Sequence, residues 1–120
     1  MRPTFSGGPN IAMKVPPQYF ETTVAFYRGT LGLAEIDELK PNVVFQFGAN
    51  RLWIDPTPEV EQAELWLQVQ TDDLEGAAGH LEQLRSERAD RIEALPEGFS
   101  GFWISSPAGV VHLASKGSAP

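Results

Sequence analysis

The chain has 120 residues, a formal net charge of −7 and no cysteine. This length fits one domain with its own hydrophobic core, and the lack of cysteine excludes disulfides, thiolate zinc sites and a cysteine nucleophile. The negative charge, without a basic stripe, argues against nucleic acid as a partner. We see neither a signal peptide nor a run of about 20 apolar residues that could span a membrane, so we expect a cytoplasmic protein that does not interact with membranes.

The first half of the chain predicts a strand, a helix and three further strands. Residues 10–15 alternate between two faces, with Ile11, Met13 and Val15 on one and Asn10, Ala12 and Lys14 on the other. An amphipathic helix is expected over residues 18–30, and Gly32 is a suitable stop because glycine accepts a left-handed backbone. The three strands are then expected at residues 34–39, 43–47 and 51–55.

The second half repeats this order. A strand is expected over residues 65–71, and Asp72 then opens a helix as its N-cap, with Glu75 at the N3 position. Further strands are expected at residues 91–94, 101–105 and 109–115. The buried stripes of the two helices align at one constant spacing, which indicates an internal repeat. The sequence therefore predicts a single α+β domain of two βαβββ modules, at about 9–58 and 63–116.

Three short motifs resemble the vicinal-oxygen-chelate superfamily, which contains glyoxalases, bleomycin resistance proteins and dioxygenases. The matching segments are Phe-Tyr-Arg-Gly-Thr-Leu-Gly-Leu at 26–33, Thr-Asp-Asp-Leu-Glu at 71–75 and the hairpin at 102–113. The resemblance implies an open mixed β-sheet that encloses a cleft, with the helices outside. It also implies a homodimer.

The same resemblance identifies four positions that hold a metal in metal-dependent members of the superfamily. Here they are Asn10, Asp55, Trp66 and His112. An indole cannot coordinate a metal and an amide is a poor ligand, so Asp55 and His112 are the two competent donors, fewer than a catalytic metal site needs. We therefore expect no cofactor, with a divalent metal as the weaker alternative.

The remaining cleft positions predict a small-molecule site. Strand alternation places Trp53 with Asp55, Trp66 with Gln68 and Gln70, and His112 with Val110 and Ala114. We expect the ligand to be bound by Asn10, Trp53, Trp66, Gln68 and Gln70. If the protein is a catalyst, His112 is the expected base or acid, because its usual pKa lies near neutrality, and Asp55 would orient it.

Structural roles are also open for these side chains. The tryptophans can be core or interface residues, and the glutamines can be solvated residues on a half-exposed strand. Asp55 can shape a turn, and His112 can be a structural residue inside a strand.

Three functions follow as expectations. The first is a metal-free protein that binds a small molecule such as an antibiotic or an aromatic metabolite. The second is a lyase, isomerase or dioxygenase of the same superfamily with an incomplete or unusual metal site, or a metal-free acid–base catalyst. The third is a dimeric interaction module.

Overall fold

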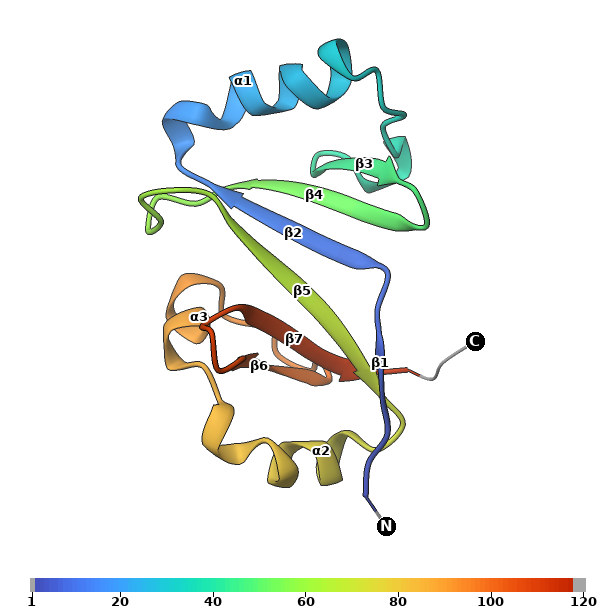
Figure 1. Ribbon diagram of the computed structural model, residues 1–120, viewed down its shortest axis with the longest axis vertical. Helices are drawn as coiled ribbons and strands as arrows, with labels where there is room; N and C mark the ends of the chain where they lie inside the picture. The colour runs from blue at the N-terminus through green and yellow to red at the C-terminus, as the bar shows by residue number, and fades with distance from the viewer. Residues whose placement is uncertain (1, 118–120) are drawn as a thin grey trace. The chain divides into compact units, whose positions relative to one another are not determined.

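The computed structural model describes residues 2–117. The chain divides into two compact units: an N-terminal unit, Pro9–Trp66, and a C-terminal unit that joins the first eight residues to the chain from Leu67 onward. Hydrogen bonds link the strands in the order β3-β4-β2-β5-β7-β6, with β1 also on β5, and both parallel and antiparallel pairs occur (Figure 1). The expected α+β class with an open mixed sheet is confirmed. In the described part of the chain, no helix is long and apolar enough to cross a bilayer.

The N-terminal unit carries one helix on one face of its strands. Its elements are β2 (Asn10–Val15), η1 (Pro17–Tyr19), α1 (Phe20–Ala25), η2 (Phe26–Thr30), η3 (Asp37–Leu39), β3 (Val43–Phe47), β4 (Asn50–Pro56) and the start of β5 (Glu64–Thr71). β2 runs parallel to β4 and antiparallel to β5, and β3 runs antiparallel to β4. Figure 1 shows α1 lying along β2 and β4.

The core of this unit lies between α1 and the sheet. It is built from Val15, Val24, Phe45, Leu52 and Ile54. Because successive strand residues point to opposite faces, the polar residues between these apolar ones lie on the face away from α1. This face holds the candidate site described below.

Two expectations for the N-terminal unit need correction. The prediction of a strand at residues 34–39 is wrong. A single bridge, Glu35 to Phe45, joins this segment to β3, and residues 37–39 form a 3₁₀ turn. Only residues 34–36 exchange backbone hydrogen bonds with β3. The helix expected at residues 18–30 is confirmed as helical, but it consists of a 3₁₀ turn, α1 and a π-helical turn. Gly32, with φ +67°, is the expected stop.

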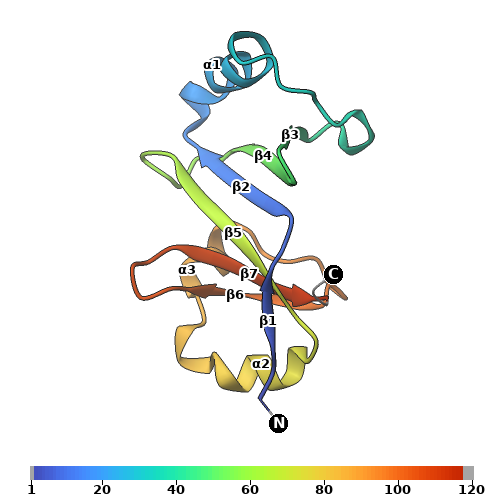
Figure 2. The same cartoon turned by 45° about the vertical axis from the view of Figure 1, so that its right-hand side comes forward.

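The C-terminal unit packs its helices against a hairpin. Its elements are β1 (Phe5–Gly7), the rest of β5, α2 (Leu74–His80), η4 (Glu82–Leu84), α3 (Glu87–Ile92), β6 (Gly101–Ser105) and β7 (Val111–Lys116). β5 pairs parallel with β7 and antiparallel with β1, which lies beside it in Figure 2. Ala77 of α2 packs in a core with Phe102, Ile104 and Ala114.

The strand expected at residues 91–94 is wrong, because this segment ends a helix. Ser86 caps α3 by accepting a hydrogen bond from the Ala89 amide at 3.2 Å. A serine N-cap followed by an acidic first turn favours a helix start, and this signal outweighs the short apolar pattern that follows it. The segment before the first expected strand supplies a further strand, β1, which the sequence did not predict.

The N-cap of α2 is Asp73 and not, as expected, Asp72. The Asp73 Oδ1 accepts a hydrogen bond from the Gly76 amide at 3.0 Å. The Asp72 Oδ1 accepts one from the Thr4 amide at 3.1 Å, and this bond holds the pKa of Asp72 below its usual value. The two adjacent aspartates therefore have different roles: one begins the helix and the other anchors the N-terminal arm.

Replacing Asp73 with alanine is expected to destabilise α2 by about 1 kcal/mol, the usual cost of losing an N-cap. Amide hydrogen exchange should then speed up at Gly76 and along α2. Asp72→Ala is the matched control, because it should speed up exchange at Thr4 and leave the start of α2 protected. Equal exchange at Gly76 in both variants would contradict this division of roles.

Candidate small-molecule site

Several predicted site residues lie together on the face of the N-terminal unit that points away from α1. The strand register aligns Ala12 with both Trp53 and Trp66, and Lys14 with both Asp55 and Glu64. Aligned residues on neighbouring strands share a face, so their side chains are adjacent. We call this surface the polar face; it includes Asn10, Lys14, Trp53, Asp55, Glu64 and Trp66, and the register also places Arg51 on it, beside Asn10.

Asn10 and Trp53 form the first contact on the polar face. The Trp53 Nε1 donates a hydrogen bond to Asn10 Oδ1 at 2.9 Å, and both side chains are half-buried. An indole that is held by its N–H keeps one orientation while part of its ring stays accessible. This arrangement is suited to stacking against a planar or cationic molecule.

Lys14 and Asp55 form the second contact. The Lys14 Nζ lies 2.8 Å from Asp55 Oδ2 and 4.7 Å from the centre of the Trp66 ring. The lysine side chain is 2% exposed and the aspartate 27%. A buried ammonium is costly unless it is paired, so the carboxylate and the ring together stabilise its charge.

Trp66 and Glu64 complete the cluster. The Trp66 Nε1 donates to Glu64 Oε1 at 3.0 Å, and the indole is buried. Trp66 was expected to contact the ligand, but its burial is that of a core residue that supports Lys14. Lys14 and Trp66 are buried, so the accessible part of the polar face is provided by half-buried residues, among them Asn10, Trp53, Asp55 and Glu64.

Sequence reasoning missed Lys14 and Glu64. Alternation along β2 places Lys14 on the same side as Asn10, so the signal for a polar partner was present. The sequence did not show that β4 lies parallel beside β2, and this pairing brings Asp55 to Lys14. Glu64 lay just outside the strand expected at residues 65–71, yet it is the first residue of β5.

Gln68, Gln70 and His112 lie in the C-terminal unit. The Gln68 Nε2 donates to the Ser115 Oγ at 3.0 Å, and the register aligns Gln70 with Ser115. His112 aligns with Leu67 and Ile104 instead, on the face that packs against α2. The sequence placed His112 in the same cleft as Gln68 and Gln70, but the register puts it on the other face of the strands from these glutamines.

His112 has a backbone contact of its own. Its Nδ1 lies 2.9 Å from the Val110 oxygen, and the ring is half-buried. This contact orients the imidazole at the start of β7. It favours the structural role that the sequence left open.

The four positions that the sequence resemblance singled out for a metal carry a poor donor set here. Asn10 Oδ1 accepts a hydrogen bond from an indole, Trp66 has no lone pair to offer, and Asp55 Oδ2 is already paired with the Lys14 ammonium. Across residues 2–117, no group of three or more histidine, aspartate and glutamate side chains is placed to hold a metal ion. These residues do not fit a divalent metal, and the absence of a cofactor stays a prediction.

The sequence matches no protein-family model and no curated protein. The fold matches solved structures. One is a hypothetical protein from Bacillus halodurans C-125, with a TM-score of 0.58 and 13% identity over 98% of this chain and 97% of that one. Another is a glyoxalase/bleomycin resistance protein/dioxygenase superfamily member from Vibrio splendidus 12B01, with a TM-score of 0.52 and 13% identity over 91% and 97%.

The chain has the vicinal-oxygen-chelate fold. A third similar structure is the Mn(II)-bound glyoxalase from Novosphingobium aromaticivorans, with a TM-score of 0.54 and 16% identity over 93% of this chain and 41% of that longer one. The fold expected from the sequence motifs is thus confirmed. At these identities the similarity concerns the fold, and the manganese belongs to that glyoxalase.

Proposed function

We propose that this vicinal-oxygen-chelate-fold protein binds a small planar or cationic molecule on its polar face, without a metal. The observation that carries the proposal is the half-buried Trp53, oriented by Asn10 and placed on the same face as the partly exposed Asp55 carboxylate. An oriented ring beside a carboxylate offers stacking and charge to one ligand. An antibiotic or an aromatic metabolite with a basic group has this chemistry.

The residue chemistry favours binding over the enzymatic alternatives. A metal-dependent lyase, isomerase or dioxygenase needs three or more suitable donors, and the polar face offers an ion pair in their place. His112, the expected acid or base, lies on the helix-packed face of its own unit. The expected homodimer stays a prediction, which sedimentation at several protein concentrations tests.

The test uses full-length protein that has been treated with a chelator and then freed of it. Planar neutral, cationic and anionic aromatic compounds are titrated while NMR follows the indole N–H signals of the three tryptophans. We expect a cationic aromatic compound to shift the Trp53 signal. Asn10→Ala should weaken its binding about fivefold, the effect of losing one orienting hydrogen bond.

Two controls make this test selective. Trp53→Leu should abolish the binding, whereas Trp103→Phe should preserve it, because Trp103 is buried in the C-terminal unit. Binding that appears only after a divalent metal is added would contradict the proposal. So would binding that is unchanged by Trp53→Leu.

A further inference from the structure

A cavity lies beside α1, on the side of the N-terminal sheet opposite to the polar face. Its volume is about 550 Å³. Its walls come from β2, η1, α1, η2 and the loop before β5. The lining residues are Met13, Val15, Pro16, Tyr19, Thr22, Thr23, Phe26, Tyr27, Glu61, Gln62 and Ala63.

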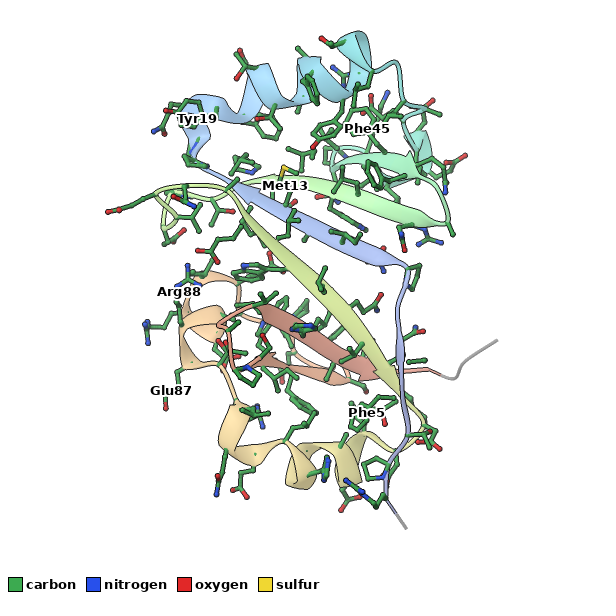
Figure 3. The ribbon with its side chains drawn as sticks, in the orientation of Figure 1. Phe5, Met13, Tyr19, Phe45, Glu87 and Arg88 are labelled. Carbon is green, nitrogen blue, oxygen red and sulfur yellow. The ribbon has the colours of Figure 1, made fainter. Side chains whose placement is uncertain are left out.

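Aromatic rings form the helix side of this cavity. Tyr19 is 56% exposed and Phe26 45%, although both line a concave surface. The rings of Phe26 and Tyr27 pack edge to face with their centres 5.1 Å apart, and the Tyr27 ring also contacts that of the core residue Phe45. Figure 3 shows Tyr19 at the start of the helix and Met13 on β2, on the side of the sheet that faces α1. The cavity thus has a fixed aromatic corner with accessible faces.

The local backbone here is a π-helical turn, Phe26–Thr30. The Leu31 amide donates to the Phe26 oxygen at 2.9 Å, the wider spacing of that helix type. Such turns are rare and are frequently found at functional sites. Both Phe26 and Tyr27 project from this turn.

The loop on the other side of the cavity supplies a negative charge. Among the described residues that line the cavity, Glu61 is the one charged side chain, and no lysine, arginine or histidine lines it. The segment before Glu61 is anchored, because the Thr57 amide donates to the Val15 oxygen at 2.7 Å and Val60 is buried. Glu61 therefore follows a fixed segment of the loop, and its exposed side chain lines the cavity.

We propose that this cavity binds an organic cation with an apolar body, such as a substituted ammonium compound. Aromatic faces attract a cation, the single carboxylate balances its charge, and Met13, Val15 and Pro16 accept the apolar part. The net charge of −7 favours the approach of a cation and disfavours an anion. This site is independent of the polar face, since Met13 and Val15 alternate with Lys14 along β2.

The test titrates the full chain with benzyltrimethylammonium and, separately, with 2-methyl-1-phenyl-2-propanol, a neutral molecule of similar shape. NMR follows the methyl groups of Thr22, Thr23 and Met13. We expect the cation to shift these signals and to bind at least threefold more tightly than the neutral molecule, the scale of an exposed cation–π contact. Trp53 does not line this cavity, so its indole signal reports binding at the polar face separately from binding here.

Variants at exposed positions complete the test. Glu61→Gln and Phe26→Leu should each weaken cation binding about threefold. Glu59→Gln is the matched control, because it removes the same charge two residues away from an exposed side chain that does not line the cavity. Equal affinity for the two probes, or equal effects of Glu61→Gln and Glu59→Gln, would overturn the proposal.

Discussion

Replacing Asp55 with alanine is expected to lower the free energy of unfolding by about 3 kcal/mol, because it leaves the Lys14 ammonium buried without this carboxylate. The double variant Lys14→Met with Asp55→Leu should recover most of that loss, since an apolar pair of similar volume avoids the cost of burying the charge. Chemical denaturation followed by circular dichroism measures both variants.

An exposed ion pair provides the control for this experiment. Lys40 and Asp37 lie 3.0 Å apart on the surface, and their hydrogen bond raises the pKa of Lys40. Asp37→Ala should leave the unfolding curve unchanged, because solvent screens such pairs. If Asp55→Ala, like Asp37→Ala, left the free energy of unfolding unchanged, the buried Lys14 ammonium would not depend on Asp55 for its stability.

Trp66→Ala is the second large change, with an expected loss of about 3–5 kcal/mol. The indole is buried, covers the Lys14 ammonium and donates to Glu64, so its removal opens a cavity and exposes a charge. Trp66→Phe keeps a ring but loses the hydrogen bond, and it should cost about 1–2 kcal/mol. Denaturation curves of the two variants test this order.

The comparison with Trp53 separates a supporting role from a binding role. Trp53→Leu should cost less stability than Trp66→Ala because Trp53 is half-buried, yet it should remove ligand binding. We thus expect Trp66 to contribute mainly to stability and Trp53 mainly to ligand binding, although both lie on the polar face. Equal stability losses would mean that the burial of Trp66 does not distinguish it from Trp53.

Much of this fold could be predicted because its signals are local. Strict alternation from Asn10 to Val15 predicted β2, and the motif at residues 26–33 indicated the end of the helical segment with its glycine stop. The segments at 34–39 and 91–94 were misjudged because their partners decide their state. The first meets β3 at a single bridge, and the second is drawn into a helix by the Ser86 cap.

The site was harder to predict than the fold, for two physical reasons. Apolar residues occupy both faces of β7, so alternation relates His112 to Ala114 but does not say which face packs against α2. The ion pair of Lys14 and Asp55 depends on parallel pairing between strands that are distant in the chain. Strand alternation predicted that Trp53 and Asp55 share a face, whereas their position beside Asn10 follows from the pairing of β4 with β2.

Metal titration of the full chain, purified without a histidine tag, tests most directly whether the site is independent of a metal. Calorimetry with zinc and manganese, together with elemental analysis of the purified protein, measures whether Asn10, Asp55, Trp66 and His112 bind an ion. We expect binding well below one metal per chain, because an ammonium and an amide–indole hydrogen bond occupy this face. Stoichiometric binding that is lost in both Asp55→Ala and His112→Ala would contradict the metal-independent site.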